Sequence, residues 1–233
     1  MITRNLSRHI KEQNWFAVVV DFTVVVSGIF IGLQAADWNQ ARLDRQEGAY
    51  HLNFLYEELV AAIDAAETEI AEIEVALRSS FEASMLLTKE SWTAEDEAAF
   101  KEQVFSTYRL WGPKRRPVSL RRMIDDGKLD LLDRDMQKAV LQFESAYIDA
   151  IEQTETSYSY SLQLTPKITA SMKFRGRQNL STATELTSNQ TLRSAVRDKA
   201  IWQRIQLDVL VELQSARLEL KQALEEHAPE LVL

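Results

Sequence analysis

The stretch WFAVVVDFTVVVSGIFIGLQ, residues 15–34, is an apolar run of 20 residues with one ionisable side chain, Asp21. A helix of this length spans roughly 30 Å, the thickness of the hydrocarbon core of a bilayer. The run is longer than the apolar region of a signal peptide, and no small-x-small cleavage site follows it. Trp15 and Trp38 fit the aromatic anchors of a membrane interface. We therefore predict an uncleaved transmembrane helix over residues 15–36, rather than a cleaved signal or a buried soluble helix.

The charges beside this run predict its orientation. The first 14 residues carry three Lys or Arg side chains and a net charge of +2, whereas residues 37–50 carry two and a net charge of −1. The flank with more Lys and Arg stays in the cytoplasm. We expect a single-pass signal anchor with a cytoplasmic tail over residues 1–14 and an exported domain over residues 37–233.

One face of the predicted span is small and polar. Asp21, Gly28 and Gly32 are separated by seven and four residues, so they share one side of a helix. The Gly28-x-x-x-Gly32 spacing permits close backbone approach, and a carboxyl group in a membrane is costly unless it is protonated or paired. We predict that this face packs against another membrane protein or a second copy, while lipid contacts the rest. The alternative is a chance spacing, with Asp21 reaching the headgroups.

The composition of the whole chain favours long helices. Its 233 residues include 6 glycines, 4 prolines and no cysteine, which leaves few helix breakers and excludes disulfide scaffolds, thiolate zinc sites and thiol enzymes. A hydrophobic content of 45% is sufficient for a packed core. The net charge of −8 argues against a nucleic-acid binder.

Apolar residues recur at helical spacing in three segments, residues 45–89, 134–162 and 190–227. The heptad-like stripes of the first and third are typical of coiled-coil packing. The predicted core positions are Leu52, Tyr56, Leu59, Ile63, Ala66, Ile70, Ile73 and Leu77; Met136, Val140, Phe143, Tyr147, Ile151, Thr154 and Tyr158; and Trp202, Ile205, Val209, Leu213, Ala216, Leu220 and Ala223.

Shorter elements are expected between these segments. Thr93 is a candidate N-cap, with Asp96 three residues later. Ser119 is a candidate cap for a short helix that Gly127 ends. From Pro166 we expect a less regular stretch. The predicted fold is all-α: one N-terminal transmembrane helix, then an antiparallel helical bundle with long amphipathic helices.

Two segments have a recognisable pattern. DFTVVVSGIFIGLQAADWN, residues 21–39, combines an acidic residue, an apolar run with glycine, Leu-Gln and Trp-Asn; LRRMIDDGKLDLLDRDMQKAV, residues 120–140, places Gly-Lys-Leu between two helices. Both resemble a broad, uncharacterised family of bacterial single-span membrane proteins. The matching residues are Asp21, Gly28, Leu33, Gln34, Trp38, Asn39, Gly127, Lys128, Leu129 and Leu132. The resemblance implies the anchored helical architecture and no activity. In a Gram-negative cell, the anchor would lie in the inner membrane and the exported domain in the periplasm.

Motifs for catalysis are not found in the sequence. His9, His51 and His227 are scattered without a metal-binding spacing, and there is no glycine-rich phosphate loop or nucleophile elbow. We therefore predict no catalytic residue, metal site or cofactor, and a protein that is not an enzyme.

A basic cluster interrupts the acidic domain. It either binds an anionic partner, lipid headgroups or a wall polymer, or it is a solvated turn whose charges pair with nearby acids. An aromatic residue beside arginines is typical of interfaces, so the cluster is a candidate interaction patch. It consists of Trp111, Lys114, Arg115, Arg116, Arg121 and Arg122.

Three functions are compatible with these patterns. The favoured one is a membrane-tethered, non-catalytic interaction or accessory protein that self-associates or joins a larger inner-membrane assembly. The second is a periplasmic ligand-binding or sensor bundle. The third is an ion-driven, stator-like subunit that uses Asp21.

Overall fold

A computed structural model describes residues 15–112, 114–175 and 178–227, apart from the side chains of residues 15–18 and 174–178. The predicted tail over residues 1–14 and the Trp15 side chain lie outside this description. The chain divides into two compact units, one ending at Gly48 and the other beginning at Ala49.

The protein is all-α apart from one pair of two-residue strands among the described residues. One helix, α2, contains the apolar run and continues into the second unit. The elements in chain order are α2 (Trp15–Leu86), α3 (Ala94–Gln103), η1 (Val104–Tyr108), α4 (Val118–Asp125), η2 (Lys128–Leu131), α5 (Arg134–Ala170), β1 (Phe174–Arg175), β2 (Gln178–Asn179), α6 (Ala183–Ser188) and α7 (Gln190–His227).

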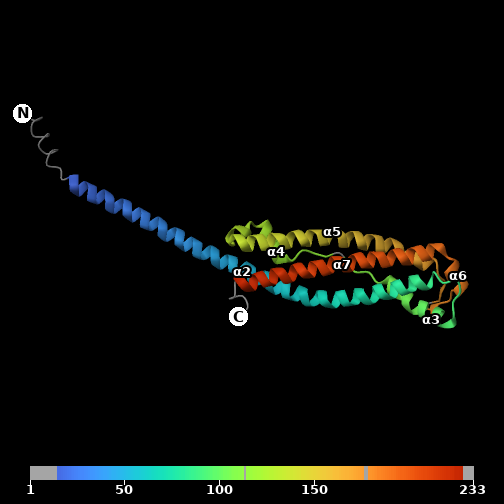
Figure 1. Cartoon of the computed structure of the whole chain (residues 1–233). Coiled ribbons are helices and arrows are strands. Elements are labelled where there is room, and N and C mark those ends of the chain that lie inside the picture. Colours follow the sequence, from blue (N-terminus) through green and yellow to red (C-terminus); the bar gives the residue numbers. More distant parts are fainter. Residues whose placement is uncertain (1–14, 113, 176–177, 228–233) are drawn as a thin grey trace, which may run out of the picture. The chain divides into compact units, whose positions relative to one another are not determined.

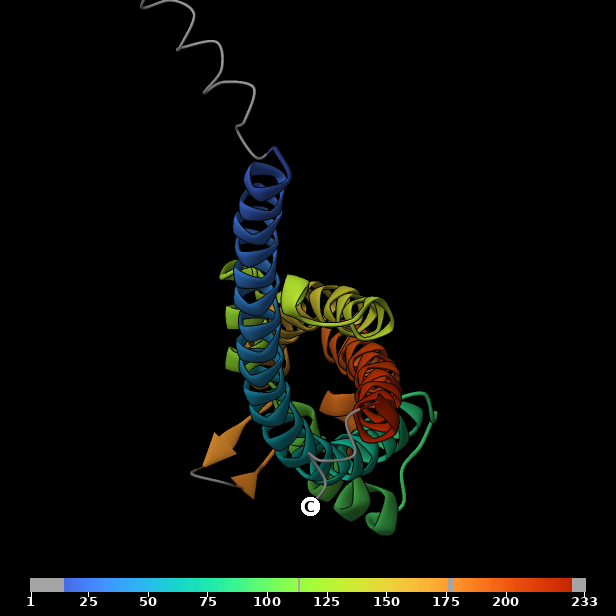
Figure 2. The same cartoon turned by 90° about the vertical axis from the view of Figure 1, so that its left-hand side faces the viewer.

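The second unit is a bundle of three long helices: residues 49–86 of α2, α5 and α7 (Figure 1). α7 runs antiparallel to the other two, and Figure 2 shows it beside α5 in a view nearly along the bundle. The hydroxyl of Tyr56 donates to Glu225 over 2.9 Å, and the amide of Gln214 donates to the Ile63 carbonyl over 3.2 Å. The first turns of the bundle part of α2, which begins at residue 49, therefore meet the C-terminal half of α7.

α2 and α5 run in the same direction, because the chain between them returns along the bundle. We call residues 104–117 the return connection: it consists of η1 and of a segment from Arg109 to Pro117 that has no regular secondary structure where it is described. The predicted antiparallel packing thus applies to α7 against each of its two neighbours. The third pair of long helices is parallel.

The local signals at helix ends are partly confirmed. Thr93 and Asp96 form the expected capping box, and Gly127 ends the α4 turn with a φ of 66°, which costs glycine little. Ser119 lies inside α4 and is not its N-cap. Glu58 of α2 caps this helix instead, accepting from the backbone N–H groups of Val118 at 3.3 Å and Ser119 at 2.8 Å.

α5 continues past Pro166 to Ala170, although proline usually ends a helix. Pro166 lies on the exposed side of α5, where the carbonyl that loses its partner can bind water. Leu164 and Ile168 beside it are 9% and 0% exposed and pack into an apolar cluster. Burial of these side chains outweighs the missing hydrogen bond.

The role of Glu58 predicts a local loss of stability. Glu58→Ala removes the acceptor for the first turn of α4 and should lower the free energy of unfolding by about 1–2 kcal/mol. The control is Glu57→Ala, because among the described residues the exposed Glu57 accepts only from Asn53, one turn away on the same helix. Urea unfolding followed by circular dichroism measures both variants. Equal losses for the two would contradict the capping role.

Candidate functional site

The first unit presents an uncovered apolar helix. Side chains from Val19 to Trp38 are exposed, apart from a half-buried Val26, within the part of the chain that the structure describes. Phe22 is 70% exposed and Trp38 67%. This helix is long and apolar enough to cross a membrane.

The predicted packing face is equally open. Asp21 is exposed, and a methyl group added at Gly28 or Gly32 would meet no described atom within 4 Å. The hydroxyl of Thr23 donates to the Val19 carbonyl over 2.8 Å, which satisfies it within the helix. The face formed by Asp21, Gly28 and Gly32 is therefore free to receive another helix backbone.

The predicted interaction patch is divided in the structure. Lys114 forms an ion pair with Glu69 of α2, and Arg116 forms one with Glu144 of α5 over 3.0 Å. These two cations hold the return connection against the long helices. Trp111 packs on a small apolar cluster between α2 and α7 and is half-buried.

The other three members of the patch remain at the surface. Arg115, Arg121 and Arg122 are exposed and form no ion pair with any described residue. The candidate patch is thus reduced to these three arginines, while its other members contribute to packing.

The interior of the bundle follows one seven-residue register in all three helices. Leu59, Val140 and Leu220 share an apolar cluster, as do Leu87, Ile168 and Leu192 in a second cluster. Between these levels, α5 and α7 pass from one buried side chain to the next by three and four residues in turn, and the segment from Ile73 to Leu87, at the end of α2, does the same. We group the buried side chains that these steps bring to the same level into layers of three.

Three consecutive layers in the middle of this register are mainly polar. All nine of their side chains are buried. The layers are Ile73, Thr154 and Gln206; Ala76, Ser157 and Gln203; and Ser80, Ser161 and Lys199. A polar section thus separates the two larger apolar clusters.

Several of these polar groups bind the backbone of the return connection. The Gln203 amide donates to the Ser106 carbonyl over 3.2 Å, and the Gln206 amide donates to the Trp111 carbonyl over 3.1 Å. The Lys114 backbone N–H donates to the Thr154 hydroxyl over 3.1 Å. An irregular segment packed on helices leaves its backbone groups without ladder partners, so Gln206 and Thr154 supply them at Trp111 and Lys114. The Ser106 carbonyl in η1 accepts from Gln203 in addition to the Arg109 N–H.

Lys199 is the most unusual member of the polar section. Its side chain is 0% exposed, and its ammonium group donates to the Ser161 carbonyl over 3.3 Å without an ion pair to a described carboxylate. Burial lowers the pKa of Lys199 to about 8, because desolvation disfavours the charged form. The contact with Ser161 joins α7 to α5 at this layer.

Arg217 is a second buried cation on the same face of α7. It is 4% exposed, lies 5.7 Å from the centre of the Tyr147 ring, and donates to the Gln214 side chain over 3.4 Å. The aromatic face partly replaces a carboxylate as its partner.

The predicted stripe of α7 is confirmed at Val209, Leu213 and Leu220 and is displaced at its other positions. Trp202, Ile205, Ala216 and Ala223 are only half-buried. The buried series are Leu192, Lys199, Gln206, Leu213 and Leu220, and Val196, Gln203, Leu210, Arg217 and Leu224. The prediction counted only apolar residues, whereas these series keep the seven-residue spacing through polar ones.

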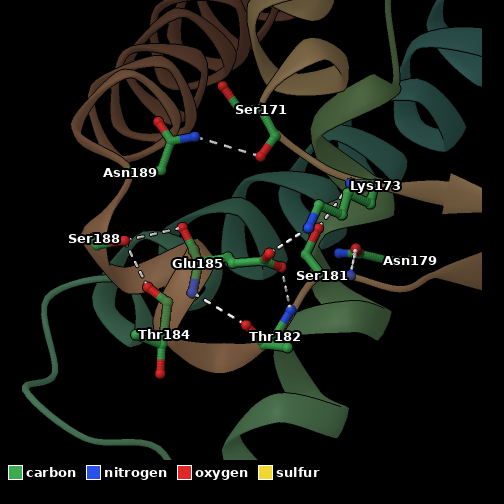
Figure 3. A network of polar contacts seen from close by, with 9 residues as sticks. All are labelled: Ser171, Lys173, Asn179, Ser181, Thr182, Thr184, Glu185, Ser188 and Asn189. Atoms are coloured by element: carbon green, nitrogen blue, oxygen red, sulfur yellow. Dashed lines mark hydrogen bonds and ion pairs between the residues drawn. The ribbon is translucent and has the colours of Figure 1, made fainter.

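A separate polar network closes the end of the bundle where α5 leads into α6 and α7 (Figure 3). Lys173 pairs with Glu185, which also forms a capping box with Thr182 at the start of α6. The Lys173 hydrogen bond is the main cause that lowers the pKa of Glu185. Asn189 donates to the Ser171 carbonyl over 3.4 Å. These contacts order the turn between α5 and α7.

Titration of Lys199 predicts a pH effect on stability. Because the folded-state pKa of about 8 lies below the ordinary 10.5, the unfolded chain binds more protons between these values, and stability rises with pH there. Lys199→Met should be more stable than the parent near pH 7, with the difference shrinking from about pH 8 to 10.5. Chemical unfolding of both proteins at a series of pH values measures this. A difference that does not change with pH would contradict burial of the ammonium group.

The comparisons with known proteins add no assignment to this geometry. No protein-family model, no curated protein and no solved structure matches this chain.

Proposed function

We propose that this chain is a membrane-anchored, non-catalytic interaction protein that acts through helix packing in the membrane and through its helical domain. The observation that carries the proposal is the open face of the apolar helix, where Asp21 is exposed and a methyl group added at Gly28 or Gly32 would meet no described atom within 4 Å. A carboxyl group and two glycines are poorly suited to lipid contact and well suited to close helix packing.

The composition of the flanks supports one orientation. We propose a single-pass signal anchor in a bacterial inner membrane, with the N-terminus in the cytoplasm and the bundle in the periplasm. Its partners are membrane lipids along most of the helix and, on the Asp21 face, a second membrane protein or another copy of this chain. Nucleic acid is not among the proposed partners, because the chain has a net charge of −8.

The bundle fits an interaction role. Its interior is occupied by packed side chains of three long helices, and its polar groups bind its own connecting segment. A domain built in this way presents long, stable helical surfaces. It serves as an accessory subunit more readily than as an enzyme.

Two positions in the apolar helix test the packing face. A photo-cross-linking amino acid at Val25 lies beside Gly28 and Gly32, whereas one at Phe30 lies on the opposite side of the helix. The two native side chains are 60% and 62% exposed, so they form a matched pair. In native membranes, we expect a discrete protein adduct from position 25 and mainly lipid adducts from position 30.

A packing variant completes this test. Gly32→Leu should abolish the adduct at position 25, because its side chain prevents close backbone approach. Mass spectrometry then shows whether the adduct contains a second copy or another protein. Equal protein adducts at both positions, or lipid adducts alone at both, would contradict the proposal.

A further inference from the structure

Two neighbouring grooves on the bundle share one exposed residue of α7, Ile201. The first has a volume of about 630 Å³ and lies between α2 and α7, from Glu74 to Ser84 and from Arg197 to Leu207. The second, of about 430 Å³, lies between α5 and α7 and includes Tyr160 and Trp202. We call this combined region the Ile201 surface.

The Ile201 surface exposes large apolar side chains in one place. Phe81 is 60% exposed, Ile201 50% and Tyr160 48%. Tyr160 is held in position by Trp202, since their rings stack with centroids 4.4 Å apart and planes within 4° of parallel. Fixed aromatic side chains of this kind are the usual anchors of a protein interface.

Its charge is opposite to that of the chain. Arg78, Arg197, Arg204 and Lys167 line the two grooves with Glu74 and Asp198, whereas the whole protein has a net charge of −8. Arg197 and Arg204 contact Asp198 and Asp208 on their own helix through exposed pairs. Such pairs contribute little and exchange readily for the carboxylates of a partner.

The shape of the first groove suits a helix. Ten residues of each flanking helix extend for about 15 Å, which matches nearly three turns of a ligand helix. An amphipathic helix binds such a groove through apolar residues spaced by three and four. The residues of the ligand helix on either side of its apolar stripe then lie beside the arginines at the edges of the groove.

We propose that the Ile201 surface binds an acidic amphipathic helix of a partner protein. This inference rests on the proposed interaction function and names the partner chemistry for the bundle. A second copy lying alongside in the same orientation would set the arginines of one surface against those of the other, so like charges disfavour that occupant.

Photo-cross-linking in native membranes tests this surface, using the full-length chain. The cross-linking amino acid is placed at Phe81, at Ile201, and at Leu141 as a control. Leu141 is 47% exposed and lies in a groove with Arg134 and Lys138 but without aromatic residues. We expect one protein adduct common to positions 81 and 201 and none at position 141. The cross-linked peptide should be acidic, with apolar residues at helical spacing.

Charge reversal supplies the second half of the test. Arg78→Glu with Arg204→Glu should reduce the adduct at position 201 by at least about fivefold, whereas Arg134→Glu with Lys138→Glu should leave it unchanged. Circular dichroism of both variants checks that the bundle is folded.

The proposal is overturned by no adduct, by adducts with phospholipid or a second copy only, or by equal effects of the two double variants. These outcomes leave the result at position 25 unaffected, so failure of this surface is distinct from failure of the membrane proposal.

Discussion

The common register of α2, α5 and α7 determines the rest of the helical domain. Apolar layers at both ends supply most of the burial, but similar apolar side chains can pack with one helix shifted by seven residues. The polar section restricts that shift, because Lys199 must reach the Ser161 carbonyl while Gln203 and Gln206 reach the backbone of the return connection. Burial of an unpaired ammonium group costs stability, and the structure gains a defined register.

The same register creates the surface through which we propose the domain acts. Phe81 of α2 lines one groove with Ala200 and Ile201 of α7 only because the two helices are aligned in this way. The return connection fills a different part of the bundle, where Lys114 and Arg116 pair with Glu69 and Glu144. Lys114 and Arg116, which are close together in sequence, therefore serve packing, whereas Arg78 and Arg204, which are distant in sequence, line the same groove of the Ile201 surface. We propose a second contact face on the apolar helix, built from Asp21, Gly28 and Gly32.

The sequence predicted the helical class, the long apolar N-terminal helix and most core positions of α2, because those positions are apolar at regular spacing. It did not predict Ser80, Lys199 or Arg217 as core residues, since polar side chains ordinarily indicate an exposed face. Their signal was the unbroken seven-residue spacing on either side of them. Glu58 as the cap of α4 depends on a contact between distant segments, which no local pattern contains. The Ile201 surface likewise needs three helices in their final alignment.

Disulfide formation between α2 and α7 measures this alignment most directly. The protein contains no cysteine, so only introduced thiols react. A cysteine at Ala83 is combined with one at Val196, which shares its apolar cluster, or at Gln203, one heptad further along α7. In the full-length chain in membranes, we expect an intramolecular disulfide for the 83 and 196 pair and little for the 83 and 203 pair. The reverse preference would show that the helices are shifted by a heptad and would contradict both the polar section and the Ile201 surface.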